Sequence, residues 1–107
     1  MIDVRLVKNQ AAQTVGFTVR NHGESHVCAA VSLLVINTVN SIESLTALGA
    51  EGFSCDYEAA GGYLSFILKE ESPRCKDAGL LIDAMVLGLE SVMAEHPSEI
   101  KIRSVTL

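Results

Sequence analysis

Strict alternation of apolar and polar side chains marks two segments near the N-terminus as half-buried strands. Residues 2–8 read IDVRLVK, with every second side chain apolar, and residues 14–20 continue the pattern as TVGFTVR. The polar Asn9–Gln10 pair between them is typical of a turn. The two segments are therefore predicted to form a β-hairpin.

The same period of two returns later in the chain. Residues 52–58 and 62–69 predict a second hairpin, and the Ala59–Gly62 link ends in two glycines, which tolerate a positive φ. After a polar break at 70–74, residues 99–105 alternate isoleucine with basic side chains and predict a last strand.

Two longer segments have apolar residues every three or four positions, as an amphipathic helix does. They cover residues 26–47 and 76–96, and Pro97 ends the second. The predicted buried stripes are Val31, Leu34, Val35, Thr38, Ile42 and Leu45 in the first helix, and Leu81, Ala84, Met85, Gly88, Leu89 and Val92 in the second.

The order ββαββαβ predicts an α+β fold, with two helices packed on a mostly antiparallel sheet. The chain has 107 residues, of which 49% are apolar. That length suits one domain spanning 1–107, with enough apolar side chains to bury a core.

Charge and cysteine content narrow the function classes. The net charge is −5 and the eight Lys and Arg residues are spread along the chain, so no direct nucleic-acid partner is expected. No apolar stretch approaches the ~20 residues of a membrane span and no apolar signal core opens the chain, so no membrane partner is expected either. Cys28, Cys55 and Cys75 form no C-x-x-C pair, which predicts reduced thiols and a cytoplasmic location.

The segment between the second strand and the first helix carries the candidate chemistry. If Ser25 is the N-cap, Cys28 is the third helical residue. Free amide N–H groups and the positive end of the helix dipole favour an anion there. A cysteine in that place is favoured as a thiolate, which is the nucleophilic form.

His22 precedes Cys28 by six residues, and Gly23 allows the intervening loop to turn back sharply. An imidazole beside a thiol can accept its proton and later deliver it to a leaving amine. The free N–H groups at the helix start can hold the oxyanion of a tetrahedral intermediate.

Non-catalytic roles for Cys28 and the nearby histidines are the alternative interpretations. A lone cysteine in an Ala- and Val-rich helix more often packs than reacts. His22, His26 and Cys28, with Glu24 or water, form an alternative metal set, but the spacing matches no strong zinc pattern, so neither a metal nor a cofactor is expected. Cys55 and Cys75 are predicted to be packing or surface thiols.

The stretch NHGESHVCAAVSLL resembles the signature of the ribosomal-processing cysteine proteases, the Prp family. That family has Gly-His-Ala at the end of its second strand and Val/Leu-Cys-Ala-x-x-Ser at its first helix. His22 matches the catalytic histidine, Cys28 the catalytic cysteine, and Ser32 the serine. The resemblance extends over the whole chain, with Gly-Gly-Tyr-Leu at 61–64 and His-Pro-Ser-Glu-Ile at 96–100.

The match also has departures. Asn21 stands where the family usually has Gly, and Gly23 where it usually has Ala. The loop is short, with Ser25 and His26 near the place where many members carry an Asp. Glu24, Ser25 and Ser32 are the candidate supporting residues, Glu24 being the candidate for orienting the imidazole.

The resemblance implies an endopeptidase that removes a short N-terminal extension from a large-subunit ribosomal protein, cutting after aromatic residues. It also implies a homodimer, for which Ala29, Leu33 and Ile36 supply a second apolar patch on the first helix. A loop at 21–27 is expected to close over substrate. The alternative is a non-catalytic, ribosome-associated binding module that uses the same cleft.

Overall fold

A computed structural model describes residues 1–46, 48, 50–58, 61–69 and 75–107, so the polar break at 70–74 lies outside the described residues. The order ββαββαβ is confirmed, with one short 3₁₀ turn added before the third strand. The elements are β1 (Ile2–Lys8), β2 (Thr14–Arg20), α1 (Ser25–Leu45), η1 (Ala50–Gly52), β3 (Phe53–Tyr57), β4 (Tyr63–Leu68), α2 (Cys75–Glu95) and β5 (Ile100–Thr106).

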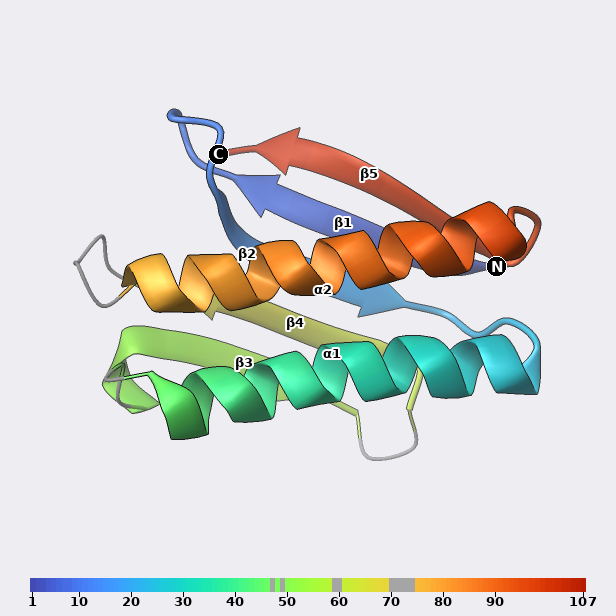
Figure 1. Cartoon of the computed structure of the whole chain (residues 1–107), viewed down its shortest axis with the longest axis horizontal. Helices are drawn as coiled ribbons and strands as arrows, with labels where there is room; N and C mark the ends of the chain where they lie inside the picture. Colours follow the sequence, from blue (N-terminus) through green and yellow to red (C-terminus); the bar gives the residue numbers. More distant parts are fainter. Residues whose placement is uncertain (47, 49, 59–60, 70–74) are drawn as a thin grey trace.

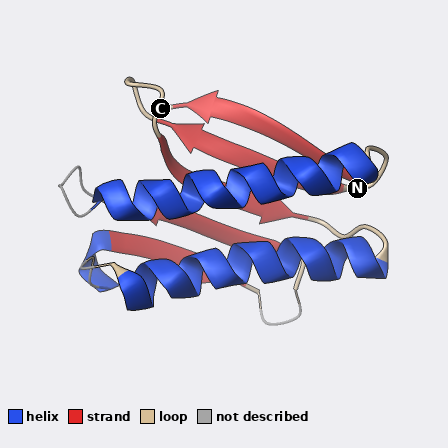
Figure 2. Ribbon diagram, viewed as in Figure 1, coloured by secondary structure: helices blue, strands red, loops and turns tan. Residues whose placement is uncertain are grey.

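The five strands form one sheet in the order β3-β4-β2-β1-β5. Three neighbouring pairs are antiparallel, and β1 pairs in parallel with β5, with Ile2 opposite Ile100. The two helices lie side by side across one face of this sheet (Figure 1; Figure 2). The predicted α+β architecture is therefore confirmed.

The core lies between the helices and the sheet. Phe17 and Phe66 are cross-strand partners on β2 and β4, and their rings stack 5.2 Å apart. Phe53 stacks on the same Phe66 ring, also at 5.2 Å. Removing the Phe66 ring would leave a cavity costing about 3–5 kcal/mol of stability. This aromatic layer supports the β3–β4 hairpin, which forms one wall of the candidate site.

The helix stripes were predicted only in part. Ala78 and Ile82 are fully buried although the predicted stripe omits them, whereas Leu45 is 76% exposed and Ala84 is also exposed. The physical reason in α2 is that this helix packs both on the sheet and on α1. A Cβ at Gly88 would come within 2.9 Å of Leu34 Cδ2, so the glycine allows the two helices to approach closely.

The expectation that no segment could span a membrane needs a correction for α1. By length and composition this 21-residue helix could cross one. In the fold it is a core helix, because Val27, Val31, Val35 and Ile42 are buried in the same core as the sheet residues. Core helices of folded domains satisfy the same compositional test.

Basic residues that are dispersed in the sequence gather on the open face of the sheet. Asp3 on β1 lies opposite Arg20 on β2 and Lys101 on β5. Its carboxylate lies 3.6 Å from the Arg5 guanidinium and 3.9 Å from that of Arg103. Sheet topology thus concentrates half of the eight Lys and Arg residues on one face, away from the helices.

Candidate active site

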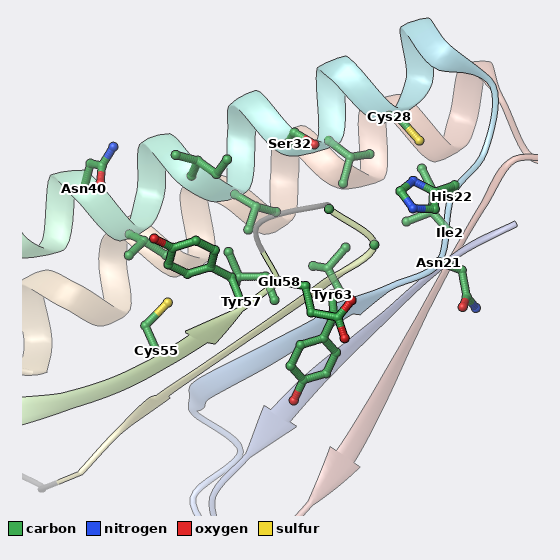
Figure 3. Close-up of a pocket in the computed structure, with 18 residues that line it drawn as sticks. Ile2, Asn21, His22, Cys28, Ser32, Asn40, Cys55, Tyr57, Glu58 and Tyr63 are labelled. Carbon is green, nitrogen blue, oxygen red and sulfur yellow. The ribbon is translucent and has the colours of Figure 1, made fainter.

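A pocket of about 450 Å³ lies between α1 and the β3–β4 hairpin. Cys28 and His22 lie at one end of it, where α1 starts, and Cys55 and Tyr57 lie further along (Figure 3). The walls between them are mostly apolar, formed by Val19, Val31, Val35, Ile36, Val39 and Leu64. The structure therefore brings the two candidate catalytic residues to the end of a groove large enough for peptide side chains.

The start of α1 differs from the prediction by one residue. Glu24, not Ser25, is the N-cap, and the Cys28 amide already donates to the Glu24 carbonyl at 2.9 Å. Ser25 is thus the first helical residue and Cys28 the fourth. Cys28 remains in the first turn at the positive end of the helix dipole, but the amides free of helical bonds are those before it.

The Cys28 sulfur contacts both backbone groups of Gly23, its N–H and its carbonyl oxygen. The Gly23 N–H donates to Sγ at 3.1 Å, and Sγ lies 3.5 Å from the Gly23 carbonyl oxygen. A thiol can donate to that carbonyl, whereas a thiolate can only accept. Loss of the proton therefore removes the second bond and makes the first one charge-assisted, and so stronger.

His22 lies in the loop before α1, and Figure 3 shows its ring beside Cys28. The preceding Asn21 has a φ of +71°, and its amide donates to the Gly62 carbonyl at 2.9 Å. Asn is the residue other than Gly that most readily adopts this left-handed conformation. The departure from the family's usual Gly is thereby explained.

Gly62, in the β3–β4 hairpin, lies directly against the His22 imidazole. It has a φ of +89°, and a Cβ built on it would lie 2.7 Å from His22 Nε2. A side chain here would both strain the backbone and displace the ring. The sequence analysis noted Gly61 and Gly62 as turn residues and as part of the family resemblance, but it missed this contact with His22, which no local pattern reveals.

Gly23 makes room for a carboxylate from the other end of the chain. A Cβ at Gly23 would lie 2.7 Å from Oε2 of Glu99, which precedes β5. That same Oε2 accepts the Glu24 amide at 2.8 Å. The second departure from the family pattern, Gly23 in place of Ala, therefore has a steric reason, and Glu99 is a site residue that sequence reasoning missed.

Of the three candidate supporting residues, Ser32 lines the pocket, whereas Glu24 and Ser25 do not. The carboxylate of Glu24 contacts Nδ1 of His26 at 3.2 Å, so it does not take the expected place beside His22. Ser25 is exposed, and Ser32 lines the pocket one turn after Cys28. The expected gating loop at 21–27 is also shorter than predicted, because residues 25–27 belong to α1.

The alternative metal set is not assembled. His26 turns to Glu24 and packs edge-on against His96, with ring centroids 5.3 Å apart. Within the described ranges, no group of three or more His, Cys, Asp or Glu side chains could hold a metal ion.

Cys55 occupies a different environment in the same pocket. Burial raises the pKa of its thiol above the usual value, and the nearby Asp56 and Glu43 carboxylates raise it further. It is therefore held as a neutral thiol, which fits the predicted packing role. Cys75 is the first residue of α2 rather than lying just before it.

A cysteine at a helix start, a histidine beside it and an apolar groove leading away from them define the active-site class of a cysteine protease. Residues 1–101 match the family model described as Cysteine protease Prp, and the chain belongs to this family of cysteine proteases.

Solved structures of relatives share the whole fold. The ribosomal processing protease Prp of S. aureus with a covalently linked product peptide is 22% identical, with a TM-score of 0.88 over 98% of this chain and 100% of that one. The same protease with a substrate peptide is 21% identical, with a TM-score of 0.84 over the same shares. SMU.848 from Streptococcus mutans is 24% identical, with a TM-score of 0.82 over 100% of this chain and 96% of that one. No curated protein matches the chain.

Proposed function

We propose that this protease cleaves a short N-terminal extension from a large-subunit ribosomal protein, with Cys28 as nucleophile and His22 as general base. One observation carries the proposal: the Cys28 sulfur, bonded to the Gly23 N–H at 3.1 Å, shares the end of an apolar groove with the His22 imidazole. Family membership and the fold shared with the S. aureus ribosomal processing protease, solved with substrate and product peptides, support the choice of substrate.

Acylation begins with transfer of the Cys28 thiol proton to the His22 imidazole. The thiolate then attacks the scissile carbonyl carbon, and the carbonyl π electrons move onto its oxygen. Free amide N–H groups at the start of α1 stabilise that oxyanion. The intermediate collapses, the C–N bond breaks, and His22 gives its proton to the departing amine, which leaves a thioester on Cys28.

Deacylation repeats these steps with water as nucleophile. His22 accepts a proton from water, and the resulting hydroxide attacks the thioester carbonyl. The C–S bond breaks, the peptide leaves with a new carboxyl group, and the proton returns to the Cys28 sulfur. The residues that this scheme uses need no metal or cofactor.

The groove favours an apolar side chain near the scissile bond. Val31, Val35 and Leu64 line its walls, and Tyr57 lies further along. A buried aromatic side chain gains about 1.5–3 kcal/mol from leaving water, which suits cleavage after an aromatic residue. A ribosomal protein is made in the cytoplasm, where reducing conditions keep Cys28 a free thiol.

The test is cleavage of synthetic peptides that cover the N-termini of the host's large-subunit ribosomal proteins, with products identified by mass. We expect one peptide to be cut at a single bond by the wild-type protein and left intact by Cys28→Ser. A wild-type protein that binds such a peptide without cutting it would establish the non-catalytic binding module instead.

We also propose that the protein is a homodimer. Leu33 and Ile36 on α1 are 71% and 50% exposed, and Ala29 lies one turn before Leu33 on the same side of the helix. An exposed apolar patch of this kind suits a self-complementary contact. Sedimentation of wild type against Leu33→Asp tests it: a dimer that becomes a monomer is expected, and a wild-type monomer at micromolar concentration contradicts it.

A further inference from the structure

We propose that Glu99 is a positioning residue for the nucleophile: its carboxylate holds the backbone at residues 22–24 so that the Gly23 N–H points at the Cys28 sulfur. The inference rests on the proposed function, because it assigns Glu99 a role in preparing the thiol that this function uses.

The carboxylate contacts the segment directly. Glu99 Oε2 accepts the amide of Glu24 at 2.8 Å, across 75 residues of sequence. Glu24 is the N-cap of α1, and it has no side-chain cap bond of its own. A carboxylate that accepts an amide at a helix N-terminus forms a charge-assisted bond and also interacts favourably with the helix dipole. Glu99 therefore satisfies the amide of the N-cap residue, as the glutamate of a capping box does from within a helix, and the later amides of the first turn stay free.

The support for this carboxylate is firm. The Glu99 carbonyl accepts the amide of Ile2 at 2.8 Å, at the point where the parallel β1–β5 pairing begins. The Glu99 amide donates to the His96 carbonyl at 3.0 Å. Both backbone groups of Glu99 are thus hydrogen-bonded, one to β1 and one to the turn that follows α2, and these bonds fix the position of its side chain.

Gly23 transmits this contact to the nucleophile. It lies directly before Glu24, and the absence of a Cβ leaves the space that Glu99 Oε2 fills, 2.7 Å from where that Cβ would be. Its own N–H donates to Cys28 Sγ at 3.1 Å. The Gly23 amide is therefore bonded to the Cys28 sulfur, and the next amide, that of Glu24, to the Glu99 carboxylate. Loss of the Glu24 bond would let the Gly23 N–H rotate away from the sulfur.

The geometry also separates a positioning role from a charge effect. The Glu99 carboxylate and the Cys28 sulfur bind the neighbouring amides of Glu24 and Gly23, so the negative charge of Glu99 would by itself disfavour a thiolate on Cys28. The acceptor oxygen is what helps. Glu99→Gln keeps an acceptor oxygen and removes the charge, whereas Glu99→Ala removes both.

The experiment measures alkylation of Cys28 by iodoacetamide from pH 5 to pH 9, with the modified cysteine identified by mass. Wild type, Glu99→Gln, Glu99→Ala and the control Glu95→Ala are compared as full chains. Glu95 is the exposed last residue of α2 and serves as the matched acidic residue.

We expect Glu99→Ala to lower the rate at pH 7 about tenfold and to move half-maximal alkylation to higher pH, as loss of one positioning hydrogen bond predicts. Glu99→Gln should stay within about twofold of wild type, with half-maximal alkylation at the same or a lower pH. Equal rates for Glu99→Ala and wild type, or a Glu99→Gln as slow as Glu99→Ala, would overturn the inference.

A double-mutant cycle with Gly23→Ala keeps the test independent of overall stability. The added Cβ meets Glu99 Oε2 at 2.7 Å, so Gly23→Ala should slow alkylation more in the wild-type background than in Glu99→Ala. Equal effects in both backgrounds would contradict the proposal. If wild-type Cys28 alkylates no faster than Cys55, the proposed function fails instead, and the variant ratios still report on Glu99.

Discussion

Two cysteines line one pocket, and their surroundings are opposite in kind. Cys28 lies in the first turn of α1, with its sulfur bonded to the Gly23 N–H and the His22 ring beside it. Cys55 lies within β3, where burial and the carboxylates of Asp56 and Glu43 raise the pKa of its thiol. The first environment offers donors and a base to an anion, and the second opposes one.

The difference shows that reactivity here depends on the backbone around the sulfur. Cys28 and Cys55 are the same type of residue and line the same pocket. Of these two cysteines, Cys28 alone lies at a helix start, with a backbone N–H bonded to its sulfur and an imidazole nearby. Experiments that remove one of these features at a time should erase the contrast between the two thiols in steps.

The largest effect is expected from the imidazole. His22→Ala should lower peptide cleavage by about 10²–10⁴-fold, the usual contribution of a general acid–base residue. Added imidazole should restore part of the rate, because it can enter the exposed space that the side chain leaves. His96→Ala is the matched control, since His96 packs against His26 outside the pocket. Equal rates for both variants would exclude His22 as the base.

A smaller effect is expected from the glycine behind the ring. Gly62→Ala adds a Cβ at 2.7 Å from His22 Nε2 and strains a φ of +89°. We expect kcat to fall about tenfold with little change in KM, because ring placement acts on the chemical step.

The control for this change is Gly79→Ala in α2, where a Cβ meets nothing within 4 Å. That substitution should leave kcat alone and raise stability by about 0.5–1 kcal/mol, as Ala does over Gly inside a helix. A Gly62→Ala enzyme with normal kcat would show that the hairpin does not position the imidazole.

The groove wall should affect binding more than chemistry. Tyr57 lines the pocket and is 71% exposed, so Tyr57→Asp should raise KM about tenfold through loss of contact with the peptide, leaving kcat within about twofold. Leu87→Asp tests the same change on α2, where the leucine is 67% exposed and lies outside the pocket lining. A KM unchanged in Tyr57→Asp would remove this groove from the substrate path.

The smallest effect concerns Cys55 and pH. Its pKa is raised in the folded chain above the ordinary 9.0, so the folded state holds the proton more tightly than the unfolded state. The stability that this contributes is complete below about pH 9 and is lost as pH rises through the folded value. Urea unfolding from pH 8 to pH 11 should therefore show a shallower decline for Cys55→Ser. Parallel curves would contradict the shift.

Most of the fold followed from local pattern. Alternation placed β1 and β2 at their observed bounds, since a half-buried strand repeats every two residues. The buried stripes of the helices were predicted less accurately. Helix α2 buries one face against the sheet and another against α1, and the sequence pattern alone does not show how wide the buried surface is. Leu45 was counted as core because it continues the period of the first stripe, but it is the last residue of α1 and is 76% exposed.

The candidate site was predictable where it is local in sequence and not where it is long-range. His22 and Cys28 stand six residues apart, with helix-start residues between them. Glu99 reaches Glu24 from 75 residues away, and Gly62 reaches His22 from another hairpin. Only the folded chain shows that Gly23 and Gly62 leave space for a carboxylate and an imidazole.

The most direct measurement of the central claim is alkylation of the native protein at pH 7 with less than one equivalent of iodoacetamide, followed by mass mapping of all three cysteines. A nucleophile prepared by the Gly23 N–H and His22 predicts that Cys28 carries nearly all of the label while Cys55 remains unmodified. Equal labelling of Cys28 and Cys55, or a preference for Cys55, would contradict the assignment of Cys28 as the catalytic thiol.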